Sequence, residues 1–283
     1  MKGLGTALIT PFKADGSVDY EALARLLDTQ LTGFVDYIVV LGTTGEAATL
    51  TADEKREVRQ CIVKYVNGRL PLVLGVGGNN TAAVCAELQS LREELVRDFA
   101  AILSVCPYYN KPNQEGLYQH FCKIAEASPI PVILYNVPGR TGVNLLPETV
   151  MRIYEAQPEK IAGIKEASGN VEQIKHLIDL ANGKLLIISG DDGIACEVME
   201  AGGAGLISVA SNAFAEDFWH IVHKKDQAKQ AQYAEMIRLL FAEGNPVGIK
   251  AVLAQKGIIQ NYLRLPLVPA SKELEGKIQK ELA

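Results

Sequence analysis

Eight short apolar runs rich in β-branched residues recur along the chain and alternate with segments of helical periodicity. The runs lie at residues 7–10, 37–41, 72–76, 101–105, 132–135, 162–165, 185–188 and 205–209. The helical segments between them include residues 20–27, 53–65, 114–127, 147–154 and 171–180. Strands spaced at roughly 20 to 35 residues, with a helix after each, are typical of right-handed βαβ units and a parallel sheet. Eight such units favour a closed (β/α)8 TIM barrel, an α/β fold, over an open doubly wound sheet, although periodicity alone does not show closure.

The pattern changes after the eighth run, where only helical periodicity follows. The helical segments there lie at residues 228–242, 247–256 and 271–282. The chain has 283 residues, which is enough for one large barrel with an appendage. We therefore expect a catalytic barrel over residues 1–227 and a C-terminal helical domain over residues 228–283, whose apolar faces pack on the barrel or on a second subunit.

Composition and charge exclude several classes of protein. The net charge is -5 and no basic stripe is present, which argues against nucleic acid or an acidic membrane surface as a partner. No apolar run reaches the roughly 18 residues of a membrane helix, and the N-terminus lacks a signal-peptide pattern, so we expect a cytoplasmic protein. The five cysteines are odd in number and scattered, which fits reduced thiols better than disulfides or a zinc site. No nucleotide-binding fingerprint is present, and Asp191 and Asp192 lack a third ligand, so we expect neither a cofactor nor a metal.

Lys165 lies near the end of the sixth apolar run, within the segment 161–167 (IAGIKEA). Its strand-forming neighbours imply a partly desolvated amine, and burial disfavours the charged ammonium, so the amine becomes nucleophilic near neutral pH. Such a lysine condenses with a ketone or aldehyde to an iminium, which withdraws electrons from the adjacent carbon without a metal or a coenzyme. The alternative is a lysine that protects an edge strand or extends its stem to water.

Polar side chains follow several of the predicted strands. Thr43 and Thr44 lie on a Gly-Thr-Thr-Gly turn, whose hydroxyls and backbone N–H groups suit a carboxylate. Tyr135 ends the fifth run and either moves a proton or serves as a core aromatic residue. Arg140 follows a Pro-Gly turn and either binds a carboxylate or is a surface charge. Because barrel strands open at one mouth, we expect these side chains to converge with Lys165.

The order of these motifs resembles the dihydrodipicolinate synthase and N-acetylneuraminate lyase family. The matching segments are residues 42–47 (GTTGEA) with Glu54, residues 135–138 (YNVP) and residues 163–167 (GIKEA). The resemblance implies a (β/α)8 barrel with a C-terminal helical domain, assembled as a homotetramer that is a dimer of dimers, or as a homodimer. Residues 108–112 (YYNKP) and 138–142 (PGRTG) match the synthase branch, because neuraminate lyases usually lack that arginine.

The resemblance also implies catalytic roles. Lys165 forms a Schiff base with pyruvate, and the pyruvate carboxylate lies on the turn of Thr43 and Thr44. Tyr135, Thr43 and Tyr109 form a proton relay, in which Tyr109 reaches in from the neighbouring subunit. The enamine then attacks an aldehyde carbon.

The implied second substrate is L-aspartate 4-semialdehyde. Arg140 holds its carboxylate, Gly190 lines the pocket by its backbone, and Ile207 lines it by its shape. The amine of the semialdehyde closes the ring, which gives 4-hydroxy-tetrahydrodipicolinate and frees the lysine. This is the first step of the diaminopimelate route to lysine.

Two other functions compete with this hypothesis. The first is another pyruvate-dependent class I aldolase of the same family, an N-acetylneuraminate lyase or a keto-deoxy sugar acid aldolase. The second is a catalytically silent binding barrel, against which the intact Lys165, Tyr135 and Thr43 argue.

The chain also departs from the family pattern. Members inhibited by lysine carry histidine and glutamate at an allosteric cleft, where this chain has Ala52, Lys55 and Ala83. We therefore expect weak or absent inhibition by lysine. Gly248 replaces the second proline of the usual Asn-Pro-x-Pro turn, which is expected to loosen the junction to the helical domain.

Overall fold

The computed structural model describes all 283 residues and contains a closed parallel barrel of eight strands. Each strand is hydrogen-bonded to its neighbours in chain order, from β1 to β8. The strands are β1 (Gly3–Ala7), β2 (Tyr37–Val40), β3 (Leu72–Gly75), β4 (Ala101–Val105), β5 (Val132–Asn136), β6 (Ile161–Glu166), β7 (Leu186–Ser189) and β8 (Gly205–Ser208). The (β/α)8 barrel predicted from the sequence is confirmed.

The first strand begins earlier than predicted. β1 covers Gly3–Ala7, whereas the apolar run that predicted it covers residues 7–10. Two glycines weaken the strand signal of this segment, and packing requires both. Gly3 has a φ of 86°, and a Cβ there would lie 2.2 Å from Oδ2 of Asp36. A Cβ at Gly5 would lie 2.2 Å from a ring carbon of Tyr37. The strand therefore has a glycine where a large neighbouring side chain crosses it.

The chain divides into two compact units. The first comprises Met1–Lys2 and Pro71–Ile207, and the second comprises Gly3–Leu70 and Ser208–Ala283. The domain boundary expected between residues 227 and 228 falls within the second unit, at the start of α11 (Gln227–Gln232), and stays a prediction.

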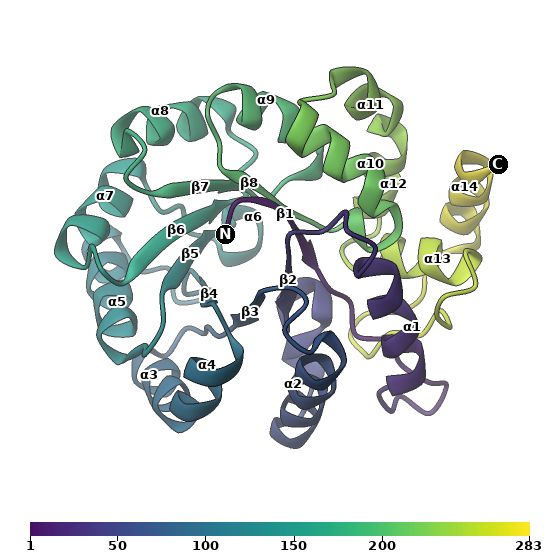
Figure 1. The fold of residues 1–283 in the computed structure, drawn as a ribbon, viewed down its shortest axis with the longest axis horizontal. Helices are drawn as coiled ribbons and strands as arrows, with labels where there is room; N and C mark the ends of the chain where they lie inside the picture. Colours follow the sequence, from purple (N-terminus) through teal and green to yellow (C-terminus); the bar gives the residue numbers. More distant parts are fainter. The chain divides into compact units, whose positions relative to one another are not determined.

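Helices line the outer side of β3 to β8 in the first unit (Figure 1). Successive helices pack side by side, α3 with α5, α5 with α7, α7 with α8, and α8 with α9. Because both faces of these strands are covered, their residues are almost all buried. These helices are α3 (Thr81–Ser90), α4 (Arg92–Asp98), α5 (Gln114–Ala127), α7 (Pro147–Ala156), α8 (Val171–Ala181) and α9 (Ala195–Glu200), with the 3-10 turn η3 (Asp192–Ile194) before α9. The short helix α6 (Pro138–Thr141) follows β5 and lies within the ring of strands in the view of Figure 1.

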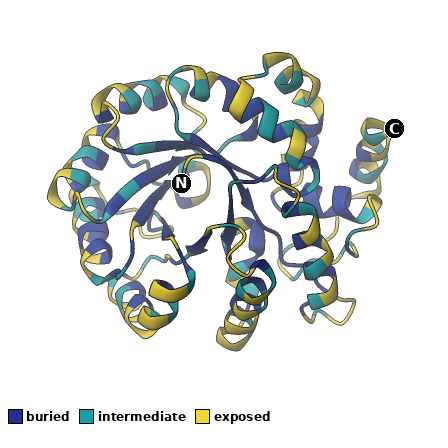
Figure 2. Ribbon diagram, in the orientation of Figure 1, coloured by how far each residue is buried: buried dark blue, intermediate teal, exposed yellow.

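The second unit contains β1, β2 and the C-terminal helices. Helix α10 packs on β1 and on α1, while α12, α13 and α14 contact one another. In each unit the buried residues, dark blue in Figure 2, lie on the strands and on the helix faces turned toward them. The elements are α1 (Tyr20–Gln30), η1 (Thr43–Gly45), η2 (Ala47–Thr49), α2 (Ala52–Val66), α10 (Ser211–Lys224), α12 (Ala234–Phe241), α13 (Val247–Gln255) and α14 (Lys272–Leu282).

Helices α12 and α13 approach each other closely at Gly248. A Cβ on this glycine would lie 2.5 Å from the carbonyl oxygen of Leu240 and 2.6 Å from its Cα. Only glycine therefore allows the two backbones to lie this close. The loosened junction to the helical domain that the sequence predicts is not tested by this contact, because Leu240 and Gly248 both lie within residues 228–283, and it stays a prediction.

Helix starts are fixed by side chains that the sequence places at the right spacing. Asn80, Asn113 and Asn170 each accept a backbone N–H at the beginning of α3, α5 and α8. Thr51 and Glu54 form a reciprocal capping box at α2. No helix combines the length and the apolarity that crossing a membrane requires.

Candidate active site

Lys165 and Tyr135 form a buried pair on neighbouring strands. They are register partners of β6 and β5, so their side chains project to the same face of the sheet. The lysine Nζ lies 4.3 Å from the centroid of the tyrosine ring. Each residue is 6% exposed, which excludes the alternative in which the lysine extends to water. A sheltered amine beside a phenol has the two groups that Schiff-base chemistry needs, a nucleophile and a proton carrier.

Gly190 gives the lysine side chain its space. The glycine follows β7, and its N–H donates to the carbonyl oxygen of Glu166 at 2.7 Å. A Cβ at position 190 would lie 2.9 Å from Cε of Lys165 and 2.6 Å from Cβ of Ala167. The backbone of residue 190 therefore forms the wall against which the lysine stem rests.

Arg140 lies on a short, well-fixed turn directly after β5. Helix α6 ends at Gly142, which has a φ of 75° and donates its N–H to the carbonyl of Pro138. The buried hydroxyl of Thr141 donates to the carbonyl oxygens of Val137 and Val143. Arg140 itself is exposed. The turn thus presents a guanidinium to solvent at the carboxyl end of the strand that carries Tyr135.

Tyr109 projects from the loop after β4. Its side chain is 88% exposed, and its backbone is in the left-handed region, with a φ of 76°. Amide side chains hold the loop: Asn79 donates to the carbonyl of Tyr108, and Asn110 donates to the carbonyl of Asn79, both at 3.0 Å. Within this chain, the ring of Tyr109 therefore lies outside the buried pair of Lys165 and Tyr135.

The Gly-Thr-Thr-Gly turn belongs to the second unit, where it forms η1 after β2. Thr43 is exposed, whereas Thr44 is 3% exposed and accepts a hydrogen bond from Nδ2 of Asn245 at 2.9 Å. The hydroxyl of Thr10 donates to the carbonyl of Gly45 at 2.8 Å. The turn is therefore anchored on one side and presents the hydroxyl-bearing Thr43 on the other. Ile207, the last predicted site residue, is buried on β8.

Sequence reasoning missed a polar network behind the buried pair. Glu166 and Asn136 are also register partners, one residue beyond Lys165 and Tyr135, so they project to the opposite face. Glu166 is fully buried and accepts N–H groups from Asn136 at 2.9 Å, from Gln173 at 3.2 Å and from the backbone of Ser168 at 2.7 Å. The alternation of side chains along a strand, applied to Tyr135-Asn136 and Lys165-Glu166, is the signal that could have revealed this placement.

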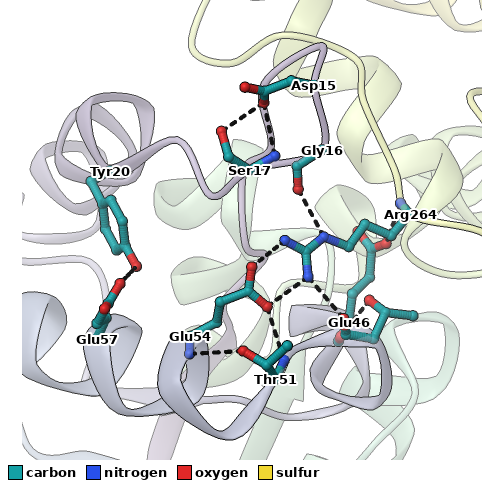
Figure 3. A network of polar contacts seen from close by, with 10 residues as sticks. Asp15, Gly16, Ser17, Tyr20, Glu46, Thr51, Glu54, Glu57 and Arg264 are labelled. Carbon is teal, nitrogen blue, oxygen red and sulfur yellow. Dashed lines mark hydrogen bonds and ion pairs between the residues drawn. The ribbon is translucent and has the colours of Figure 1, made fainter.

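A second group of charged residues was also missed. Glu46 and Glu54 were noted only as parts of the family motif, yet both pair with cations from residues 245–283, called the C-terminal segment below. Glu46 pairs with Lys250. Glu54 pairs with Arg264, as Figure 3 shows. The Arg264 guanidinium lowers the pKa of Glu54 to about 2, because it donates hydrogen bonds to the carboxylate.

A (β/α)8 barrel with a buried lysine near the carboxyl end of a strand has the architecture of an enzyme that works at the barrel mouth. The whole chain, residues 1–283, matches the Dihydrodipicolinate synthetase family. This chain belongs to that family.

Individual relatives match over nearly their whole length. The 4-hydroxy-tetrahydrodipicolinate synthase of Parabacteroides distasonis is 47% identical, over 100% of this chain and 96% of the relative. The chloride-inhibited dihydrodipicolinate synthase of Acinetobacter baumannii, solved in complex with pyruvate, has a TM-score of 0.94 at 40% identity, over 99% of this chain and 97% of that one. A monomeric dihydrodipicolinate synthase variant has a TM-score of 0.94 at 38% identity, over 100% and 96%.

Proposed function

We propose that this chain condenses pyruvate with L-aspartate 4-semialdehyde to give 4-hydroxy-tetrahydrodipicolinate, in lysine and diaminopimelate biosynthesis. The observation that carries the proposal is the buried amine of Lys165, which lies 4.3 Å from the centroid of the Tyr135 ring on adjacent strands. The synthase names of relatives across the full length favour this reaction over cleavage of sialic acid or a keto-deoxy sugar acid.

The reaction begins with covalent capture of pyruvate. The amine of Lys165 attacks the keto carbon, and loss of water leaves an iminium. The iminium makes the pyruvate methyl acidic, and Tyr135 carries the proton away, which gives an enamine. Two features of the structure favour this step. The amine is shielded from water, and the absence of a side chain at Gly190 leaves space for the lysine stem.

The enamine then forms the new carbon–carbon bond. Its nucleophilic carbon attacks the aldehyde carbon of the semialdehyde, and the resulting alkoxide takes a proton from the relay. The amine of the semialdehyde attacks the iminium carbon, which closes the ring and expels the lysine. One water leaves overall, in the first step, so the ring product retains the hydroxyl that was the aldehyde oxygen.

The remaining site residues bind and orient the substrates. The turn of Thr43 and Thr44 binds the pyruvate carboxylate, and Thr43 continues the proton relay from Tyr135. Arg140, exposed on its fixed turn, pairs with the carboxylate of the semialdehyde. Gly190 and Ile207 line the substrate pocket, by backbone and by shape.

Tyr109 completes the relay from a second copy of the chain. Its ring is 88% exposed on a loop held by amide hydrogen bonds, as expected of a side chain that is buried only on assembly. We therefore propose a homotetramer built as a dimer of dimers, or a homodimer, acting in the cytoplasm. Sedimentation of wild-type protein and of Tyr109→Phe tests the assembly, and activity of the variant tests the relay.

Two coupled assays test the reaction. One follows ring formation from pyruvate and aspartate semialdehyde, and the other follows cleavage of N-acetylneuraminate. We expect turnover only in the first, and a loss of at least about 10³-fold in Lys165→Ala. Lys160→Ala is the matched control, because this lysine precedes the same strand and only donates to the carbonyl of Ser128. Turnover of the sugar acid without ring formation would contradict the proposal.

A further inference from the structure

The turn that carries Thr43 and Thr44 ends in an unfavourable backbone conformation. Glu46, directly after the turn, has a φ of 51° and a ψ of 35°, in the left-handed region. For a residue with a side chain this conformation costs about 1 kcal/mol or more. Two backbone hydrogen bonds help to hold this conformation. The N–H of Glu46 donates to the carbonyl of Thr43 at 3.1 Å, and the N–H of Thr49 donates to the carbonyl of Glu46 at 3.0 Å. These bonds are local, so the direction of the turn depends on its longer-range contacts, which are the bond from Thr10 to the carbonyl of Gly45 and the contacts of the Thr44 and Glu46 side chains.

The Glu46 carboxylate is held by the C-terminal segment. One oxygen accepts from the ammonium of Lys250, and the other accepts from the backbone N–H of Arg264 at 3.2 Å. The side chains of the pair are 0% and 1% exposed. Lys250 also donates to the carbonyl of Tyr262 at 3.0 Å and lies 4.2 Å from the ring centroid of Phe12. The ammonium therefore has two hydrogen-bond acceptors and an aromatic ring around it, and it has no access to solvent.

A buried ion pair of this kind is an inefficient way to stabilise the folded state. Burying two charges rarely gains more than an apolar pair of the same volume, whereas removing one partner costs about 3 to 5 kcal/mol. A buried pair is better explained by the geometry that it enforces. Here it is anchored to α13, since Lys250 lies on that helix, and it fixes the residue next to the turn.

A second side chain from the same segment holds the other end of the turn. Asn245, just before α13, donates to the hydroxyl of Thr44 at 2.9 Å. Asn245 and Lys250 thus hold the turn at Thr44 and at Glu46, on either side of Gly45. An outer layer supports them, in which Arg264 pairs with Glu54 and donates to the carbonyl of Thr49 at 2.8 Å (Figure 3).

We propose that Glu46 and Lys250 are positioning residues for pyruvate, and that the C-terminal segment thereby sets the affinity of the turn for the pyruvate carboxylate. The inference rests on the proposed function, which assigns that turn to pyruvate. Neither side chain touches substrate, because both are buried beneath the turn. Their loss therefore acts by letting Glu46 relax out of the left-handed region, which swings the hydroxyl of Thr43 and the adjacent N–H groups away from the carboxylate.

The test compares the double variant Glu46→Leu/Lys250→Met with wild type. Both charges are removed together, so no unpaired ion is left in the core and the volume is nearly kept. We expect a melting temperature close to wild type, a half-saturating pyruvate concentration raised about tenfold, and an unchanged KM for the semialdehyde. Lys277→Met is the control, because it breaks an exposed ion pair with Glu273 in the same C-terminal segment, with side chains 51% and 78% exposed.

Borohydride trapping separates this inference from the proposed function. The trapped fraction is measured by mass spectrometry against pyruvate concentration, without the semialdehyde. If wild type traps no pyruvate, the proposed function fails. If wild type traps pyruvate and the double variant shows the same concentration dependence, only the positioning role is overturned. A parallel rise in both KM values with a lowered melting temperature also overturns it, because that pattern indicates general loosening.

An isosteric single substitution keeps the test decisive if the double variant does not fold. Glu46→Gln keeps the shape and one acceptor but removes the charge that holds the ammonium. We expect a rise of about threefold in half-saturating pyruvate, in the same direction as the double variant. An unchanged value in this variant, with folding intact, overturns the proposal.

Discussion

Replacing Gly190 by alanine perturbs the reactive lysine with a single methyl group. The new Cβ would lie 2.6 Å from Cβ of Ala167, 2.9 Å from Cε of Lys165 and 3.1 Å from its Cγ. Carbon atoms in contact normally lie about 3.5 to 4.0 Å apart, so these neighbours must move by roughly 0.5 to 1 Å. The backbone cannot easily withdraw, because the N–H of residue 190 is bonded to Glu166 at 2.7 Å. The lysine stem is the flexible partner and takes most of the displacement.

The expected magnitude follows from this geometry. Overpacking of this kind costs about 1 to 3 kcal/mol of stability. A reacting group misplaced by about 1 Å loses up to about 100-fold in rate. We therefore expect Gly190→Ala to slow Schiff-base formation by roughly 10- to 100-fold while the protein remains folded. Backbone strain does not contribute, because Gly190 is not among the glycines with positive φ.

The assay is the rate of borohydride-trapped pyruvate adduct in single turnover, beside urea unfolding of the same sample. The matched control is Gly276→Ala in α14, where an added Cβ meets no atom within 4 Å, and we expect unchanged trapping and slightly higher stability. Ala167→Gly combined with Gly190→Ala removes the contact with residue 167 but not the contact with Lys165. This double variant should regain stability and still trap slowly. Trapping at the wild-type rate in folded Gly190→Ala would refute the reasoning.

Three further predictions concern packing, pH and regulation. Gly248→Ala places a methyl group 2.5 Å from the backbone oxygen of Leu240. We therefore expect urea unfolding to show a free energy of unfolding lowered by about 3 kcal/mol or more, and a decrease below about 1 kcal/mol would contradict this. Burial lowers the pKa of His120 to about 4, so the folded state resists protonation. The stability that this residue contributes is fully present above the unfolded pKa of about 6.5 and is lost as pH falls toward 4, by roughly 2 kcal/mol between about pH 7 and about pH 5. His120→Gln should lack this part of the pH dependence, and an identical acid profile would contradict the assignment. Steady-state kinetics with added lysine should show weak or no inhibition, since Ala83 offers no carboxylate to the effector; potent inhibition would contradict this.

Local pattern was enough to predict the buried pair. Lys165 and Tyr135 each end an apolar run, and parallel strands in a barrel bring such ends to one mouth. The same strand alternation accounts for Asn136 and Glu166, one residue further on, which meet on the opposite face and were not predicted. The structure places both pairs as register partners. This part of the site can be predicted from periodicity because β5 and β6 follow one another along the chain and pair in the barrel.

The ion pair beneath the Gly-Thr-Thr-Gly turn could not be predicted in this way. Glu46 and Lys250 are separated by 204 residues, and no periodic signal links them. Lys250 lies in an apolar helical segment, where a lysine alone indicates only a charge at a helix surface. The contact arises from the way the C-terminal helices pack. Sequence patterns predict each helix separately and do not predict how the helices pack together. The close approach at Gly248 could not be predicted for the same reason, because it depends on the facing backbone of Leu240.

The location of the covalent bond to pyruvate tests the central claim most directly. The protein is incubated with pyruvate, reduced with borohydride, digested and mapped by mass spectrometry. The account predicts one reduced pyruvyl adduct, on the peptide that contains Lys165, and none in Lys165→Ala. An adduct that persists in Lys165→Ala, or that maps to an exposed lysine such as Lys277 instead, would contradict the account.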